Sequence, residues 1–215
     1  MIILIGGEKG GTGKTTVATN LAQMRASAGR DVLLIDSDKQ ESASSWAGLR
    51  EEIGTEPAIT TVQKVGKNIT RDLMDLATRY DDLIVDAGGR DSVELRAAMV
   101  AAHKLFIPVQ ASQFDVWTLG NMSELVDQAQ ALNPALQAYV VLNRASPNPA
   151  VSESDEAREL FNDFENLDFC GVTLRDRIAF RKASSGGLGI NELSPADAKA
   201  QAEISQLYEV VFDEK

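Results

Sequence analysis

The most constraining feature of this chain is a glycine-rich segment that lies between a short apolar run and a stretch with helical patterning. From residue 8 to residue 16 it reads Glu-Lys-Gly-Gly-Thr-Gly-Lys-Thr-Thr. Glycines allow backbone N–H groups to turn inward around phosphate oxygens, and a following helix adds the partial positive charge of its N-terminus. The segment therefore predicts a phosphate-binding loop between a strand and a helix. The alternative is a glycine-rich turn that binds nothing.

The residue types in this loop suggest separate roles. Lys14 supplies a cation for the β- and γ-phosphates of a nucleotide, and the Thr15 hydroxyl is placed to ligate Mg²⁺. Thr16 is the next residue along the helix and is expected to contact the α-phosphate. The backbone cradle is expected to consist of Gly10, Gly11, Thr12 and Gly13.

Apolar runs alternate with helix-patterned segments along the chain, which predicts an α/β fold with a largely parallel central sheet flanked by helices. The runs are rich in Ile, Val and Leu and mostly unalternated, as strands buried on both faces are. We see no linker or repeat, so residues 1–215 are expected to form a single domain. The expected strands are Ile2–Ile5, Val32–Ile35, Leu83–Val85, Leu105–Val109, Tyr139–Leu142 and Phe169–Leu174, with Thr60–Gln63 as an edge strand. The expected helices are Lys14–Ala28, Lys67–Tyr80, Asp91–Ala102, Val116–Leu132, Ser152–Asn166 and Pro195–Phe212.

Composition excludes several classes of protein. The chain has 215 residues and a net charge of −11, which argues against a uniformly basic nucleic-acid coat. Cys170 is the single cysteine, so neither a disulfide framework nor a cluster of Cys metal ligands is expected within one chain. There is no long apolar run and no signal-peptide pattern, so we expect a cytoplasmic protein.

Carboxylates follow two of the apolar runs. Asp36 and Asp38 end the second run, and Asp86 ends the run at 83–85 in the form of a Walker B strand. The carboxyl ends of parallel strands face the ligand crevice, so these carboxylates are expected near the phosphate loop, with Asp86 holding Mg²⁺ through a water molecule. The alternatives are that Asp38 caps a helix beginning near Glu41 and that Asp86 caps the helix after it.

The loop departs from the standard pattern, because Glu8 stands where a glycine is usual and Lys9 adds a second lysine. In this it resembles the deviant Walker A loop of the ParA/MinD family. That resemblance implies a SIMIBI-type P-loop NTPase fold, ATP and Mg²⁺ as cofactors, and slow ATP hydrolysis. It also implies that Lys9 acts in catalysis, reaching across an ATP-sandwich homodimer to the phosphates of the other subunit. The alternative for Lys9 is a solvated loop lysine.

The same resemblance assigns roles to the two acidic strand ends. It implies that Asp36 lies close to Mg²⁺ and that Asp38 orients or activates the attacking water. Lys39 replaces the usual proline of this switch, which loosens the backbone and adds a cation. Gly88-Gly89 stands where relatives often have two prolines and gives a more flexible second switch.

Further along, Asn143 and Arg144 end an apolar run that is similar to the family strand whose asparagine reads the adenine edge. An amide offers a donor and an acceptor together, which suits adenine. We therefore expect Asn143 and Arg144 in the nucleotide site. The alternative for Asn143 is a turn-forming residue.

Residues 174–182 concentrate positive charge in an otherwise acidic chain. The segment carries Arg175, Arg177, Arg181 and Lys182 against the single acid Asp176. Residues 177, 181 and 182 have helical spacing and are expected to share roughly one face. The resemblance implies that this region contributes to non-specific, salt-dependent DNA binding by the ATP-bound dimer. The alternative is a solvated face or a set of intramolecular salt bridges.

Taken together, the resemblance implies a small plasmid-partition ATPase of the ParA type without an N-terminal DNA-binding domain. Such a dimer would associate with the nucleoid when ATP-bound and would be released by a cargo- or centromere-binding adaptor protein that stimulates hydrolysis. The acidic C-terminal segment argues against a membrane anchor. Alternatives are a positioning ATPase for a non-DNA cargo such as a chemoreceptor cluster or division site, a conjugation-linked DNA-transfer ATPase, or a P-loop small-molecule ligase.

Overall fold

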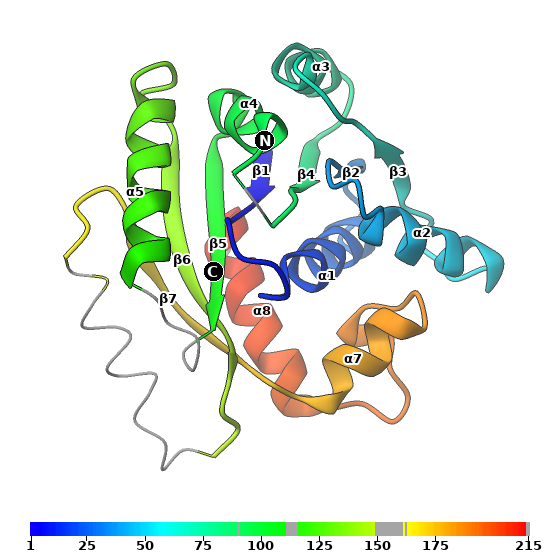
Figure 1. The fold of residues 1–215 in the computed structure, drawn as a ribbon. Helices are drawn as coiled ribbons and strands as arrows, with labels where there is room; N and C mark the ends of the chain where they lie inside the picture. Colours follow the sequence, from blue (N-terminus) through cyan, green and yellow to red (C-terminus); the bar gives the residue numbers. More distant parts are fainter. Residues whose placement is uncertain (90, 111–115, 149–160, 162, 214–215) are drawn as a thin grey trace.

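The computed structural model describes residues 1–89, 91–110, 116–148, 161 and 163–213. Strands and helices alternate along most of the chain (Figure 1). The strands are β1 (Ile2–Ile5), β2 (Val32–Asp36), β3 (Thr60–Gln63), β4 (Asp82–Asp86), β5 (Lys104–Gln110), β6 (Gln137–Ala145) and β7 (Asp168–Arg175). The helices are α1 (Lys14–Ser27), α2 (Ser42–Glu52), α3 (Ile69–Leu76), α4 (Val93–Ala101), α5 (Val116–Gln130), α7 (Ile178–Ser185), the short 3₁₀ turn η2 (Ile190–Glu192) and α8 (Ala198–Phe212).

Within the described residues, the seven strands form one sheet in the order β3-β2-β4-β1-β5-β6-β7, and all neighbouring pairs are parallel. The predicted α/β fold is confirmed, and β3 lies at an edge as expected. β1 lies at the centre, so the loop that follows it leaves the carboxyl edge between β4 and β5.

The core consists of two apolar layers, one on each face of the sheet. Alternate residues of β1 point to opposite sides, so Ile2 and Leu4 belong to one layer and Ile3 and Ile5 to the other. The first layer packs against α3, α4 and α5, and the second packs against α1, α2, α7 and α8. Both faces are therefore covered, which explains why the central strands lack polar alternation.

Most predicted segments agree with the structure to within a few residues. β1 and β3 have the predicted bounds. The structure extends the other five strands by one or more residues, because backbone pairing continues there: Asp36 in β2 is the register partner of Asp86 in β4. Most of the helix expected at 152–166 lies outside the described residues, at 152–160 and 162. In the part of the chain that is described, no helix is both long enough and apolar enough to cross a membrane.

Candidate functional site

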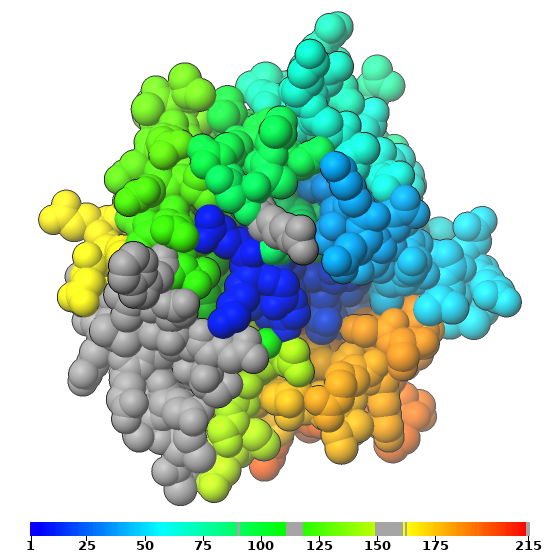
Figure 2. Space-filling view, viewed as in Figure 1, coloured from blue at the N-terminus to red at the C-terminus, as the bar shows by residue number. Residues whose placement is uncertain are grey.

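The phosphate loop lies at the carboxyl edge of the sheet, between the end of β1 and the start of α1. Figure 2 shows it in blue at the centre of one face of the molecule. Gly11 and Gly13 have positive φ angles of 75° and 90°, which side chains rarely tolerate. Gly13 is also the N-cap residue of α1 and has no side chain to satisfy the first N–H groups of that helix. This is the arrangement that binds anions at helix N-termini.

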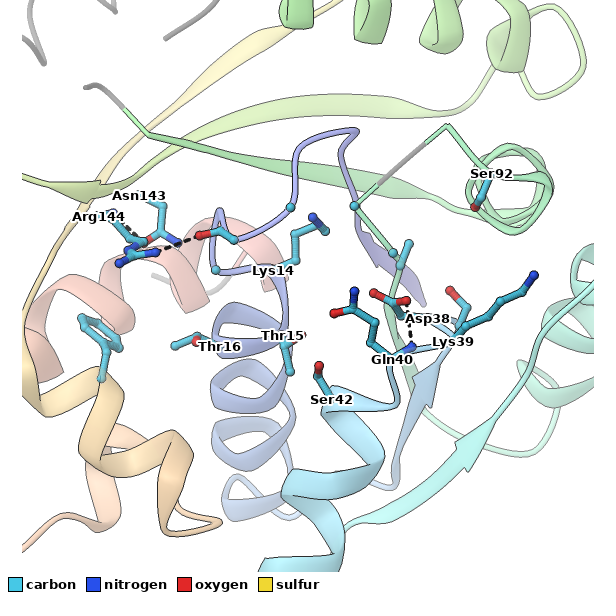
Figure 3. Close-up of a pocket in the computed structure, with 18 of the residues that line it drawn as sticks. Lys14, Thr15, Thr16, Asp38, Lys39, Gln40, Ser42, Ser92, Asn143 and Arg144 are labelled. Carbon is cyan, nitrogen blue, oxygen red and sulfur yellow. Dashed lines mark hydrogen bonds between the residues drawn. The ribbon is translucent and has the colours of Figure 1, made fainter. Parts of the chain in front are cut away.

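A cavity of about 900 Å³ opens over the loop, a volume typical of small-molecule and cofactor sites. The loop, the segments after β2 and β4, the end of β6 and the β7–α7 region all contribute to its lining (Figure 3). The predicted nucleotide-site residues that line it are Gly10, Gly11, Gly13, Lys14, Thr15, Thr16, Asp38, Asn143 and Arg144.

Lys14 is buried, and its Nζ donates a hydrogen bond to the backbone oxygen of Lys9 over 2.7 Å. Burial lowers the pKa of Lys14, while the nearby Asp86 and Asp38 carboxylates act to raise it. The amine is thus held against the loop by a backbone carbonyl oxygen.

Lys9 and Thr12 lie toward β5 and α5. Both residues line a second, much smaller cavity, and neither lines the cavity of about 900 Å³ over the loop. Thr12 is buried and donates weakly from Oγ1 to the Lys9 oxygen over 3.4 Å. The role expected for Lys9 requires a second copy of the chain, so it stays a prediction.

Thr15 and Asp86 form the corner in which a metal ion was predicted. The Thr15 hydroxyl donates to Asp86 Oδ2 over 2.6 Å. Asp86 Oδ1 is buried and has no hydrogen-bond partner in the described part of the chain. Burial raises the pKa of Asp86 to about 7; the Thr15 hydrogen bond opposes this rise, and neighbouring Asp36 adds to it. An unpartnered buried carboxylate oxygen beside a threonine hydroxyl is a suitable place for a cation.

Asp36 and Asp38 differ in what they contact. Asp36 is fully buried, and its two oxygens accept from the backbone N–H groups of Asp38 and Ser44 over 3.1 and 2.8 Å. It therefore fixes the segment after β2 and the start of α2. Its expected position near Mg²⁺ stays a prediction.

Asp38 lines the large cavity, and its Oδ1 accepts from the Gln40 N–H over 3.0 Å. The N-cap residue of α2 is Glu41, and its side chain makes no capping hydrogen bond. Asp38 therefore does not cap the helix, which was its alternative role; its side chain instead stabilises the turn before α2. The corresponding alternative for Asp86 is also not seen, because Ser92 caps α4 by accepting from the Leu95 N–H.

The Gly88-Gly89 segment after β4 packs tightly against the rest of the site. A Cβ on Gly88 would lie 3.1 to 3.3 Å from the Asp38 carboxyl group. A Cβ on Gly89 would lie 2.8 Å from the Gly10 Cα and 3.0 Å from the Lys14 amine. Glycine is thus required at residue 89 by the close approach of two backbones.

Asn143 and Arg144 lie beside the loop, as predicted, and both donate hydrogen bonds to it (Figure 3). Asn143 Nδ2 donates to the Thr12 oxygen over 2.6 Å, and Arg144 Nη1 donates to the Gly11 oxygen over 2.9 Å. The turn-forming alternative has partial support, because Asn143 Oδ1 accepts from the Arg144 N–H and Arg144 has a positive φ of 54°. The expected contact with adenine stays a prediction.

Sequence reasoning missed Gln110, whose Nε2 donates to the same Gly11 oxygen over 2.8 Å. The signal was available: Gln110 is a polar residue that ends an apolar strand at the same edge as Asp36 and Asp86. Unlike Asn143, Gln110 belongs to no motif of the resembled family that would have marked its amide as part of the site.

The basic segment departs from the expected helical face. Arg175 ends β7, and Arg177 precedes α7 in an extended conformation, so only Arg181 and Lys182 lie on the helix. The prediction of one helical face through residues 177, 181 and 182 was therefore wrong, because the helix begins only at Ile178.

Three of these four cations are paired within the chain, which supports the salt-bridge alternative for them. Glu203 of α8 lies 2.6 Å from Arg177 and 3.4 Å from Arg175, and Asp176 lies 2.9 Å from Arg181. Arg177 and Glu203 are largely buried. Arg175 and Arg181 also line the nucleotide cavity, whereas Lys182 is exposed.

The described residues contain no group of three or more His, Cys, Asp or Glu side chains placed to hold a metal ion on their own. Mg²⁺ usually takes one or two protein ligands and completes its shell with phosphate oxygens and water.

Comparison with known proteins agrees with this geometry. Residues 3–190 match the model of the CobQ/CobB/MinD/ParA nucleotide binding domain. The maintenance of carboxysome distribution protein A of Halothiobacillus neapolitanus is 28% identical over 210 residues, covering 95% of this chain and 93% of that protein. The chromosome-partitioning ATPase Soj of Thermus thermophilus is 28% identical over 227 residues, covering 93% and 91%.

Among solved structures, the septum site-determining protein MinD of Pyrococcus horikoshii, complexed with Mg-ADP, superposes with a TM-score of 0.73. Sequence identity is 18%, and the match covers 98% of this chain and 95% of that one. The family match spans the loop, both acidic strand ends and the basic segment. The chain belongs to the CobQ/CobB/MinD/ParA nucleotide binding domain family.

Proposed function

We propose that this protein is a Mg²⁺-dependent ATPase that positions a cargo by cycling between an ATP-bound dimer and a nucleotide-free form. The observation that carries the proposal is the Thr15–Asp86 corner beside the phosphate loop. There, a buried carboxylate oxygen without a partner lies next to a loop built for phosphate. The family description and the Mg-ADP bound to the relative from Pyrococcus horikoshii support this reading.

The residues present fit ATP and Mg²⁺. Thr15 and Asp86 would hold the metal ion, whose chemistry is to neutralise charge on the phosphate oxygens. Lys14 would leave the Lys9 carbonyl and bind the phosphates instead. Asp38 lines the cavity at the edge of this corner, where it would orient the attacking water and accept its proton. Lys9 would add positive charge from the partner of a dimer.

The cargo is open to two interpretations. Soj of Thermus thermophilus is a chromosome-partitioning ATPase, which favours a DNA cargo such as a plasmid, with a centromere-binding adaptor protein and non-specific nucleoid binding. The relative from Halothiobacillus neapolitanus maintains carboxysome distribution, which favours a non-DNA cargo carried on the nucleoid. In both cases we propose a cytoplasmic protein that associates with DNA when ATP-bound, through Arg181 and Lys182 on the outer part of α7.

The proposal is tested by measuring ATP turnover and molecular mass of the purified chain with ATP, with ADP, and with ATP after Mg²⁺ is chelated. We expect slow turnover that requires Mg²⁺, and a dimer with ATP but not with ADP. Retention on long DNA should follow the dimer. A monomer under all three conditions with no turnover would refute the proposal. Turnover only after a small metabolite is added would favour a ligase.

A further inference from the structure

The outward-facing side of the phosphate loop is held by three side chains from the ends of β5 and β6. A peptide that turns its N–H toward a phosphate turns its C=O roughly the opposite way, where the carbonyl needs a donor of its own. Thr12 is buried, whereas Gly11 is exposed. The Gly11 and Thr12 oxygens receive donors from Gln110, Asn143 and Arg144, at distances of 2.6 to 2.9 Å.

The sheet places two of these donors next to each other. Gln110 and Asn143 are register partners in the parallel β5–β6 pair. Their carboxamides therefore lie side by side at the carboxyl edge and reach two consecutive carbonyls of the loop. Both side chains are more than nine-tenths buried. The hydrogen bond from Asn143 to the Thr12 oxygen is itself buried, so water does not substitute easily for that donor, whereas the hydrogen bond from Gln110 to the Gly11 oxygen is only partly buried.

The fit is close on the loop side as well. A Cβ on Gly13 would overlap the Asn143 Nδ2 atom, so the amide lies directly against the N-cap residue of α1. Asn143 Oδ1 is also engaged, because it accepts from the Arg144 N–H over 2.9 Å. The asparagine is thus fixed at both ends.

We propose that Gln110, Asn143 and Arg144 form a carbonyl clamp that keeps the loop in its phosphate-binding shape. Gln110 is its positioning residue: it touches neither the phosphates nor the metal corner, and it acts through the Gly11 oxygen. This inference rests on the proposed function, because the clamp matters only if the loop binds a nucleotide.

The clamp predicts a specific pattern of defects. Both ATP and ADP use the loop, so loss of one clamp donor should weaken both by the same factor. The residues that act on the attacking water are untouched, so the turnover rate at saturating ATP should change little. Replacing a residue that only stabilised the fold would lower the melting temperature without separating nucleotide affinity from turnover in this way.

The test compares Gln110→Met with Gln130→Met. Gln130 also donates from its amide to a backbone carbonyl, that of Leu136 over 3.0 Å, but away from the loop. We expect Gln110→Met to lower the affinity for ATP and ADP roughly three- to tenfold, as one hydrogen bond would. Its turnover at saturation should stay within about twofold of the wild type, and Gln130→Met should keep wild-type affinity with a similar change in melting temperature.

Equal nucleotide affinity in Gln110→Met and the wild type would overturn the clamp, as would an equal loss of affinity in both variants. If Gln110→Met does not fold, Gln110→Asn carries the test, because it stays neutral and polar while its amide, one methylene shorter, is drawn back from the Gly11 oxygen. Absence of nucleotide binding by the wild type would instead refute the proposed function itself, so the two failures are distinguishable.

Discussion

The two sides of the phosphate loop end their strands in different chemistry. On one side, the register partners Asp36 and Asp86 end β2 and β4. On the other, the register partners are Gln110, which ends β5, and Asn143, which lies two residues before the end of β6. On the first side, the carboxylate side, one buried oxygen of Asp86 has no hydrogen-bond partner among the described residues. On the second, the carboxamide side, the amides of Gln110 and Asn143 donate hydrogen bonds to the loop. The comparison teaches that one side is built to meet a ligand and the other to hold the loop that meets it.

The largest effect is expected from Lys14, which lies between the two sides. Lys14→Ala removes the cation expected to bind the phosphates, so ATP affinity should fall at least about 100-fold. Binding of a fluorescent ATP analogue measures it, and Lys199→Ala, a lysine in the first turn of α8, is the control. Unchanged affinity in Lys14→Ala would remove the basis for the whole comparison.

Asp38→Ala separates chemistry from binding on the carboxylate side. Turnover should fall about 100- to 1,000-fold, because the group expected to orient and deprotonate water is lost. ATP affinity should stay within about threefold, so the ATP-bound dimer should accumulate. Mass measurement with ATP and a phosphate-release assay test this, with Asp75→Ala on the exposed part of α3 as control. Normal turnover in Asp38→Ala would show that another residue positions the attacking water.

Asp86 makes a pH-dependent contribution to stability. Its pKa rises from 3.8 to about 7 on folding, so the folded protein keeps a proton that the unfolded chain releases in this range. Stability without nucleotide should therefore fall as pH rises from about 4 to 7 and then level off.

Asp86→Asn removes this charge, and at pH 8 it should raise the free energy of unfolding by about 1–3 kcal/mol. The gain should disappear below pH 4, and the Mg²⁺ requirement for tight ATP binding should be lost. Urea unfolding at several pH values measures the first effect. A variant no more stable than the wild type at pH 8 would show that the unpartnered carboxylate carries no such cost.

The smallest effect on ATP affinity is expected from the exposed basic residues of α7, Arg181 and Lys182. Arg181→Glu with Lys182→Glu should weaken DNA retention by the ATP-bound dimer, lowering the slope of its salt dependence, and leave ATP affinity within about twofold. Arg71→Glu with Lys67→Glu on the opposite part of the molecule is the matched control for charge. DNA retention equal to that of the control would reassign the DNA-binding surface.

The carboxylate side could be predicted from the sequence because its residues follow a motif with fixed spacing. Lys14 and Thr15 lie at the start of α1, Asp86 ends β4, and Asp38 follows β2 by two residues, so the apolar pattern of these elements locates all four. Six of the seven strands of the described residues were predicted because buried parallel strands are continuous apolar runs, whereas β3, which is polar and partly exposed, was expected only as an edge strand.

The carboxamide side and the basic segment could be predicted only in part. The contacts of Gln110 and Asn143 depend on which strands become neighbours, and no local pattern gives that order. The pairing of Arg177 with Glu203 depends on the position of α8, and the late start of α7 removed the helical spacing on which the predicted basic face rested.

The central position of β1 has a consequence for how the protein is made. β1 is the first of these strands in chain order, yet its two neighbours are β4 and β5. A ribosome must therefore release the chain through Phe106 before β1 can pair along its length on both sides, and through Arg144 before every donor to the Gly11 and Thr12 oxygens is available. The nucleotide site is therefore completed late in synthesis, although the phosphate loop within it is among the first segments to be translated.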